Sequence, residues 1–336
     1  MTSTSIGDLA QSMATRMQMT RLKSNLNMLT TELSTGRKED VAKQMRGEFS
    51  AVAALEGEMR ALSSYDVAVR EGSLLLDAAQ VALTNIYDQV VDAGPDFLLT
   101  SEVSDSAMLK AAGQDAEQKL ATLISSLNLS VAGRAIFGGV ATDNPPLLSA
   151  EALLDELSTV VMGAATPQDT ATLIDSWFND AGGGFETVAY QGSPTAGLTI
   201  PVGPGETVSY SITAGDQAVR DVLASFATAA LVARGSFDGD PTAQAEMLEI
   251  AGQSMLNAEA SFSVLQAEVG TQQSFLEDAR ERIDASLNAH QMALNELYSA
   301  DPYEVATQLE AISLQLETLY AVTSRLSGLS MTEYLR

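Results

Sequence analysis

The sequence predicts a mainly α-helical protein. Both chain ends are expected to form a long antiparallel, coiled-coil-like helical bundle, with a small mixed α/β, hairpin-rich domain inserted between them. Three observations lead to this fold class. Apolar residues recur at helical spacing near both ends, aromatic residues make up only 5% of the 336 residues, and the middle is rich in Gly, Pro, Thr and Val. Few aromatics and heptad-like spacing favour thin seams between helices over a thick core.

The N-terminal part carries three expected helices. The first has a leucine stripe at 4-3-4 spacing, formed by Leu22, Leu26, Leu29 and Leu33. The second covers about 49–92 and would be on the order of 65 Å long at about 1.5 Å per residue. The third covers 106–127. Apolar residues that recur every seven residues, as in the second helix, are typical of left-handed coiled-coil packing.

The C-terminal part repeats this pattern. One stripe recurs every seven residues and consists of Phe262, Val269, Leu276, Ile283, His290 and Leu297. A last helix is expected to open at Asp301-Pro302, because Asp suits the N-cap and Pro the first helical position, while Glu304 takes the reciprocal place of a capping box. The stripe of this last helix consists of Val305, Leu309, Ile312, Leu316, Leu319 and Leu326.

The middle of the chain has a different pattern. Alternating residues predict short strands over 186–190, 198–202 and 207–213, with a turn at Gly203-Pro204-Gly205. Short helices are predicted over 150–162 and 170–178.

These patterns predict three domains. Residues 1–35 and 302–336 would form terminal coiled-coil helices for assembly, 36–146 and 216–301 a helical rod, and 147–215 an inserted outer domain.

Charge excludes several classes of partner. The chain has 18 Lys and Arg against 44 Asp and Glu, which gives a net charge of −26. Residues 1–70 hold 9 basic and 8 acidic residues, a net charge of +1, so the remaining 266 residues carry −27. Nucleic acids and anionic membrane surfaces bind proteins through clustered Lys and Arg, so we expect neither as a partner.

The residue types that carry most catalytic and metal chemistry are nearly missing. The chain has no Cys, which excludes disulfides, thiolate nucleophiles and zinc–sulfur sites, and its one His is His290. The N-terminus lacks the pattern of a Sec-type signal peptide, and no apolar run approaches the roughly 18 residues needed to cross a bilayer. We therefore expect a soluble chain that, if it leaves the cell, uses another export route.

Four motifs invite a functional interpretation, and each has a simpler structural one. His290 lies on an apolar stripe without a nearby nucleophile, so a packed side chain is expected. Asp238-Gly239-Asp240 lacks the later ligands of a calcium loop and predicts a turn followed by a helix cap. Gly203-Pro204-Gly205 has no following helix to bind a phosphate. Gly270 inside a long helix costs about 1 kcal/mol relative to Ala, which a close approach of a neighbouring helix would explain.

The leucine seams at the chain ends are the expected functional surface, and we expect no catalytic, cofactor-binding or metal-binding residues. The seams also fit the core faces of an ordinary helical bundle. However, the first 33 residues contain no aromatic residue, and isolated helices of this kind are marginal in water. Such ends either pair with each other or pack against a neighbouring subunit on assembly. The expected assembly residues are Leu22, Leu26, Leu29, Leu33, Leu309, Ile312, Leu316, Leu319 and Leu326.

Four segments of the chain resemble the flagellin superfamily. Leu33–Lys38 (LSTGRK) is similar to the family's LSTG-basic segment, which ends its first helix. Gly133–Pro146 (GRAIFGGVATDNPP) is similar to the family's GRYxFxG…TDxPP block, and 269–277 (VGTQQSFLE) to its VG…LE segment. The tail Gly328–Arg336 (GLSMTEYLR) resembles hook-associated members of the superfamily and not filament flagellins. The resemblance covers about 1–146 and 216–336.

One segment departs from the family pattern. The acidic-acidic-Pro turn that usually follows LSTG is replaced by Glu39-Asp40-Val41, without a proline. We therefore do not expect residues 38–50 to follow the family geometry.

The resemblance implies an axial, non-enzymatic protein of the bacterial flagellum without a cofactor. It implies export without a cleaved signal peptide through the flagellar type III export apparatus, helped by an export chaperone, and a location outside the cell. It also implies a ring of copies of the chain itself, between the first hook-associated protein and the flagellin filament. The terminal helices, disordered in free subunits, would pair into an inner tube, and residues 182–215 would face outward.

Two alternatives stay open. A filament flagellin is the nearest one, and the tail argues against it. A cytoplasmic coiled-coil signalling or scaffold protein would share the Cys-free heptads but would not predict an insertion with strands. An enzyme comes third, because no constellation of residues supports it.

Overall fold

The computed structural model describes residues 5–39, 50–103, 105–195 and 197–334, with the backbone alone described for 5–9 and 326–334. The chain divides into two compact units. Unit 1 combines Met1–Ala61 with Ala285–Arg336, and unit 2 is Leu62–Asp284. The segment that departs from the family pattern, after Glu39, lies almost wholly outside the described residues. The three-domain division expected from the sequence stays a prediction.

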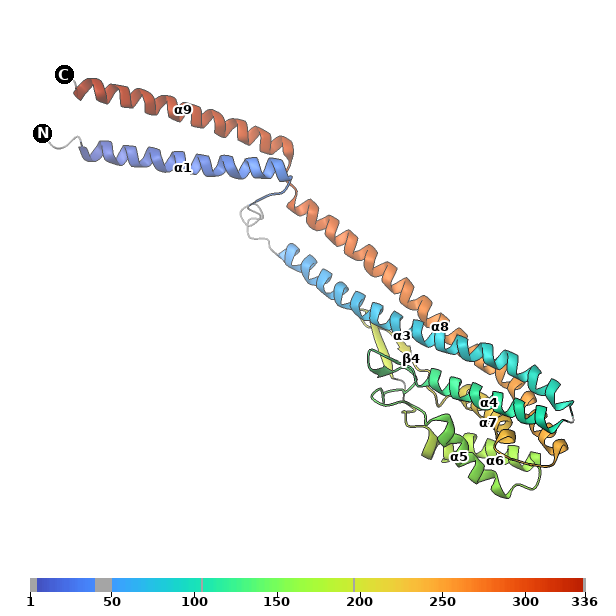
Figure 1. The fold of residues 1–336 in the computed structure, drawn as a ribbon. Helices are drawn as coiled ribbons and strands as arrows, with labels where there is room; N and C mark the ends of the chain where they lie inside the picture. Colours follow the sequence, from blue (N-terminus) through green and yellow to red (C-terminus); the bar gives the residue numbers. More distant parts are fainter. Residues whose placement is uncertain (1–4, 40–49, 104, 196, 335–336) are drawn as a thin grey trace. The chain divides into compact units, whose positions relative to one another are not determined.

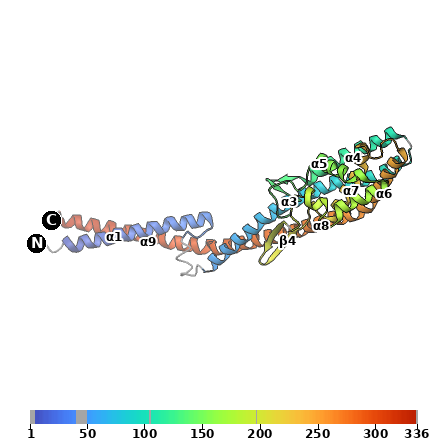
Figure 2. The same cartoon turned by 90° about the horizontal axis from the view of Figure 1, so that it is seen from below.

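The predicted fold class is confirmed: the chain is mainly α-helical, with long helices and a small β insertion. Unit 1 contains α1 (Ser5–Thr35) and α9 (Pro302–Tyr334), which lie side by side in Figures 1 and 2. It also contains the beginning of α3 (Ser50–Ser101) and the end of α8 (Pro241–Tyr298). Helix α3 runs nine residues beyond the expected end at 92 and includes Pro95 in its interior.

Unit 2 is built around the remaining parts of α3 and α8. Helices α4 (Ser106–Leu127) and α7 (Gln217–Ala233) pack on each other, and α5 (Ala150–Val160) and α6 (Pro167–Asn179) pack against α7, as Figure 2 shows from below. A 3₁₀ turn over Val161–Gly163 follows α5. Helix α7 is the centre of the unit, because most of its residues are buried and Phe226 meets Phe97 of α3 edge-to-face at 6.1 Å.

Glycines allow close helix contacts inside unit 2. A Cβ on Gly113 of α4 would lie 2.7 Å from the backbone nitrogen of Ala233, so α4 and α7 approach too closely there for any side chain. Gly94 of α3 and Gly252 of α8 form a second close contact, where a Cβ on Gly252 would lie 3.0 Å from the Gly94 carbonyl oxygen. Packing at this distance leaves no room for a methyl group without a backbone shift.

Gly270 does not behave as the sequence predicts. A Cβ at this position would meet nothing within 4 Å, and the residue is exposed. The expected close approach of another helix of the chain is therefore wrong at Gly270. The close approaches occur instead at Gly94, Gly113 and Gly252, whose neighbours on other helices come near in space but not in sequence.

The described residues contain two short antiparallel hairpins, one before the predicted insertion at 147–215 and one inside it. Strand β1 (Ser130–Val131) pairs with β2 (Arg134–Ala135), and β3 (Leu198–Gly203) pairs with β4 (Glu206–Tyr210). The turn predicted at Gly203-Pro204-Gly205 is present, with Gly205 at a φ of +77°. The larger hairpin packs on α3, where a Cβ on Gly72 would overlap the side chain of Ile200.

Two strand predictions need correction. Residues Phe185–Ala189 form a π-helical turn and not a strand, because Phe185 and Ala189, four residues apart, are both buried, and Phe185 packs against Trp177 and Phe178. Only Tyr190 makes an isolated bridge, with Leu147. Strand β4 ends at Tyr210 and not at 213, because the chain turns so that Ala214 N–H donates to the Phe137 carbonyl oxygen.

The predicted turn and cap at Asp238–Asp240 are confirmed. The Asp240 carboxylate accepts hydrogen bonds from the backbone N–H groups of Thr242 and Ala243, each at 3.1 Å, at the start of α8. Gly239 has a φ of +88°, which suits the tight turn before the cap.

Asp216, at the start of α7, uses its carboxylate differently. Its Oδ2 accepts a hydrogen bond from the Thr213 N–H at 2.6 Å, so it ties the helix to the preceding loop and not to its own first turn. Burial raises the pKa of Asp216, against the opposing effects of the Thr213 hydrogen bonds and the Arg220 charge.

We expect Gly113→Ala to destabilise the protein by about 1–3 kcal/mol, because the new methyl group forces α4 and α7 apart. Gly270→Ala is the matched control and should stabilise the protein by about 0.5–1 kcal/mol, because it adds helix propensity in open space. Denaturant unfolding monitored by circular dichroism measures both. Equal effects of the two variants would contradict the packing described here.

We expect the free energy of unfolding of Asp216→Asn, relative to that of the unchanged chain, to increase as pH rises from 3 to 7. A carboxyl with a raised folded pKa stabilises the fold below its unfolded pKa, about 3.9, and this contribution is lost as pH rises through the folded pKa. Unfolding free energies across this pH range test the expectation, with the exposed Asp238→Asn as control. A gap that shrinks with rising pH would show that Asp216 is stabilised as a carboxylate.

Candidate assembly surface

Helices α1 and α9 pair through a small apolar cluster at one end of their hairpin. Leu29 of α1 is 3% exposed and packs with Ala300 and Val305, which are 7% and 6% exposed. Leu309 and Ile312 are partly buried against the same cluster. Burying such side chains stabilises the pairing by roughly 1.5–3 kcal/mol for each fully buried Leu, Ile or Val.

The end of α1 is fixed by a glycine cap and a short backbone pairing. Gly36 has a φ of +67°, and its N–H donates to the Glu32 carbonyl oxygen at 2.8 Å, as expected of a left-handed residue that ends a helix. The chain then pairs antiparallel with the α8–α9 connection: Lys38 N–H donates to the Tyr298 carbonyl at 2.9 Å, and Ala300 N–H donates to the Gly36 carbonyl at 2.9 Å. The Arg37 guanidinium lies 5.6 Å from the centre of the Tyr298 ring.

A buried acidic side chain supports the same junction. Glu32 is 7% exposed, and its Oε1 accepts a hydrogen bond from the Glu39 N–H at 2.9 Å. A buried carboxylate without a hydrogen-bond donor would be costly, so this bond also fixes the path of the chain after Lys38.

The start of α9 follows the prediction for Asp301 but not for Glu304. Asp301 Oδ1 accepts from the backbone N–H groups of Tyr303 at 2.8 Å and Glu304 at 3.3 Å, and Pro302 is the first helical residue. The Glu304 carboxylate accepts instead from the Gln308 side-chain amide at 3.1 Å. The side chain of Glu304 therefore points along the helix toward the next turn.

The structure brings the predicted seams of α1 and α9 together within one chain. Leu29 and Leu316 are buried, Leu33 is 43% exposed, and the side chain of Leu326 lies outside the described residues. The other predicted seam residues are half-buried: Leu22, Leu26, Leu309, Ile312 and Leu319. Whether these residues also contact other copies stays a prediction.

Sequence reasoning missed the residues that close the hairpin. Ala300, Glu32 and Gly36 carry the junction, and none belongs to the leucine stripes. The glycine after the last periodic residue of α1 was the available signal, because such a glycine commonly accompanies a chain reversal.

The paired helices leave several large apolar side chains in contact with solvent. On α1, Met13 and Met17 are 63% and 67% exposed. On α9, Leu314 is 65% exposed, and Tyr320 and Val322 are each 47% exposed. A two-helix hairpin can bury only one stripe of each helix, so large apolar side chains outside the stripes stay wholly or partly exposed. Exposed apolar surface of this kind is typical of interaction sites.

His290 makes an ordinary helix–helix contact. Its Nε2 lies 3.3 Å from Glu58 Oε2, joining α8 to the beginning of α3 within unit 1. The side chain is 27% exposed, and the contact involves a single acidic partner. Among the described residues, no group of three or more His, Cys, Asp or Glu side chains could hold a metal ion.

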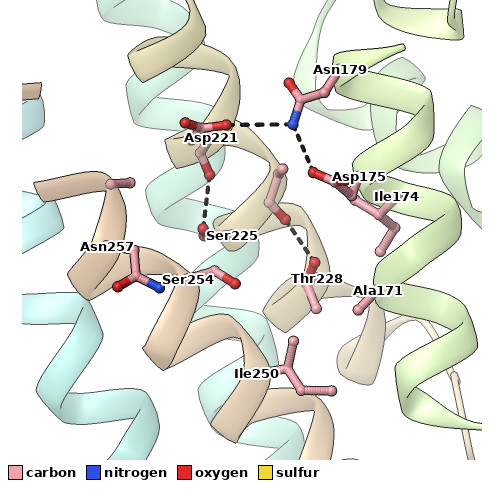
Figure 3. Close-up of a pocket in the computed structure, with 12 residues that line it drawn as sticks. Ala171, Ile174, Asp175, Asn179, Asp221, Ser225, Thr228, Ile250, Ser254 and Asn257 are labelled. Carbon is pink, nitrogen blue, oxygen red and sulfur yellow. Dashed lines mark hydrogen bonds between the residues drawn. The ribbon is translucent and has the colours of Figure 1, made fainter. Parts of the chain in front are cut away.

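A cavity of about 240 Å³ lies between α6, α7 and α8 and offers polar groups (Figure 3). The Asn179 side-chain amide donates to Asp175 Oδ1 at 2.8 Å and to Asp221 Oδ1 at 3.4 Å. The hydroxyls of Ser225 and Thr228 donate to carbonyl oxygens one turn earlier in α7. Neither of these two hydroxyls is bonded to a side chain that could remove its proton, so neither is arranged as the nucleophile of a hydrolytic site.

Within the described residues, no helix is both long and apolar enough to cross a bilayer. The fold and its paired ends define a mainly α-helical protein with an antiparallel terminal hairpin.

No protein-family model and no curated protein matches the chain. Among solved structures, Bacillus cereus FlgL is similar at 14% sequence identity and a TM-score of 0.43, over 70% of this chain and 98% of that chain. A Vibrio parahaemolyticus protein described as a flagellar hook-associated protein is similar at 14% identity and a TM-score of 0.40, over 70% of this chain and 94% of that one. At these values neither likeness carries an argument about function.

We expect Leu29→Ala to loosen the hairpin by about 2–5 kcal/mol, because it removes the centre of the apolar cluster. Leu33→Ala, four residues later on the same helix and largely exposed, is the control and should change the pairing little. The rate of limited proteolysis within α1 reports the open population of the hairpin. Equal acceleration in both variants would mean that the cluster at Leu29 does not hold the helices together.

Proposed function

We propose that this chain is a structural, non-enzymatic protein of the bacterial flagellum that joins the hook to the flagellin filament. In this role it corresponds to the hook–filament junction protein, the third of the hook-associated proteins. It would assemble outside the cell as a ring of copies between the first hook-associated protein and flagellin, after export by the flagellar type III apparatus with the help of a chaperone.

The observation that carries this function is the terminal hairpin, which buries one stripe of each helix and leaves large apolar side chains exposed. Its two helices bury one stripe at Leu29 and Leu316, while Met17 and Leu314 on other faces remain more than half exposed. Such a hairpin has apolar surface left over for neighbouring copies, which suits a protein that completes its core by polymerisation.

The segments that resemble the flagellin superfamily support the same function. Leu33–Lys38 is the segment whose backbone pairs with the α8–α9 connection, so the family-like motif has a physical task in the hairpin. The tail Gly328–Arg336 favours a hook-associated role over that of a filament flagellin.

Deleting the gene should leave hooks in place, remove the filaments and release flagellin into the medium. Electron microscopy of the cells and detection of flagellin in the culture supernatant measure these outcomes. If the chain were a filament flagellin, the deletion strain would shed no flagellin into the medium. If it were a cytoplasmic scaffold, filaments would stay attached. Either result would overturn the proposed function.

A pair of variants tests the exposed face itself. Leu314→Asp places a charge on the outer face of α9, where it does not disturb the cluster at Leu29, and should abolish filament attachment. Thr307→Asp, at an exposed polar position of the same helix, should complement the deletion. Circular dichroism of the purified variants controls for folding, and attached filaments with Leu314→Asp would exclude this face from assembly.

A further inference from the structure

The hairpin of β3 and β4 in unit 2 has two outer edges with different chemistry. Pro201 of β3 pairs with Thr207 of β4. Because proline has no N–H, this pair cannot be of the hydrogen-bonded kind, so the backbone N–H and C=O groups of Thr207 point away from β3. The pattern alternates along an antiparallel ladder, so Ser209, which pairs with Thr199, also directs its backbone groups outward.

One of these edges is protected and the other is open. The outer edge of β3 carries Pro201, and proline is a residue that blocks further strand pairing at sheet edges. The outer edge of β4 presents the outward groups of Thr207 and Ser209, and both residues are exposed. Within the part of the chain that the structure describes, β3 is the only strand paired with β4.

A groove lies beside this open edge. It has a volume of about 600 Å³ and is lined by Val208 of β4 and by Gln272 and Phe275 of α8. Phe275 is 58% exposed, and the buried Oε1 of Gln272 has no hydrogen-bond partner among the described residues. A residue directly opposite Val208 on an added strand would point to the same face of the sheet and therefore over this groove.

We propose that the open edge of β4 binds β4 of a second copy of this chain, with the two strands antiparallel and centred on Val208. Thr207 and Ser209 lie symmetrically about Val208, so each Thr207 meets Ser209 of the second copy. This register pairs every outward N–H and C=O group of both residues, which is the self-complementarity that a two-fold interface requires. Val208 then lies opposite Val208 of the second copy, above Phe275.

Charge favours a meeting of two acidic chains at this place. Residues 207–210 of β4 include no charged side chain, and Glu206 at the start of the strand lies 3.3 Å from an Arg282 guanidinium nitrogen. In the proposed register the two Glu206 residues are about 14 Å apart along the strands, beyond the Debye length of about 8 Å at physiological salt. Two chains of net charge −26 can therefore pair here without bringing unpaired carboxylates together.

This contact uses unit 2 alone and goes beyond the proposed function, which depends on the terminal hairpin of unit 1. The two can fail separately, because a variant of β4 leaves α1 and α9 unchanged.

Cysteine crosslinking tests the register directly, because the chain has no Cys of its own. Opposed residues of a non-hydrogen-bonded pair have Cα atoms about 4.5 Å apart, within the range that a disulfide can bridge. Val208→Cys should therefore form a disulfide-linked dimer under mild oxidation about tenfold faster than Thr199→Cys, which is on the edge protected by Pro201. Equal rates in the two variants would overturn the proposed register.

Proline substitutions test the contact at the outer edge of β4 without introducing a disulfide bond. Thr207→Pro removes an N–H that points away from β3, so the hairpin keeps its own ladder, and Thr199→Pro makes the matched change on the other edge. Sedimentation of the full chain at rising concentration should show dimers for the unchanged chain and Thr199→Pro, and monomers for Thr207→Pro. A dimer that Thr207→Pro leaves intact, or a chain that is monomeric throughout, would overturn the β4 contact. If circular dichroism shows that Thr207→Pro does not fold, the crosslinking rates of Val208→Cys and Thr199→Cys alone test the β4 contact.

Discussion

The backbone pairing between the end of α1 and the α8–α9 connection is the interaction on which the terminal hairpin depends. Gly36 adopts a left-handed conformation, ends α1 and lets Lys38 and Ala300 complete the pairing. This sets the register in which Leu29 meets Val305. Without it, two helices with narrow apolar stripes would have little to fix one alignment over another, because a single stripe can slide by a heptad at small cost.

The apolar side chains of the hairpin differ widely in burial. Leu29 and Leu316 are buried and Leu22 and Leu319 are half-buried, whereas Met13 and Met17 are mostly exposed. Unit 2 differs in this respect. Its central helix α7 is buried on nearly all sides, and its glycines at 94, 113 and 252 allow contacts that need no further partner. Among the described residues of unit 1, large apolar side chains such as Met17 and Leu314 therefore stay exposed.

Much of the fold could be predicted from the sequence, because periodicity and capping act locally. Helix α4 begins and ends where its apolar spacing predicts, and Asp301-Pro302 begins α9 by the chemistry of an N-cap. The strand expected at 186–190 was wrong because residues 185–190 fit both an alternating and a helical spacing, and only the aromatic cluster around Trp177 decides between them. Gly270 was misjudged for a related reason, since the partner of a helical glycine is set by tertiary packing. Two leucines of the predicted stripes, Leu29 and Leu316, are buried, and their helical spacing is visible in the sequence. The roles of Glu32 and Ala300 could not be predicted, because they arise from a chain reversal that brings residues 36–39 to 298–300.

Hydrogen exchange of the same chain in two states tests most directly whether its ends are completed by other copies. The amides of α1 and α9 would be compared in the free protein and in isolated flagella, with α4 and α7 as internal references. The account predicts that exchange in α1 and α9 slows strongly on assembly while α4 and α7 change little. Equal protection of α1 and α9 in both states would contradict it, because the hairpin would then be complete in the single chain.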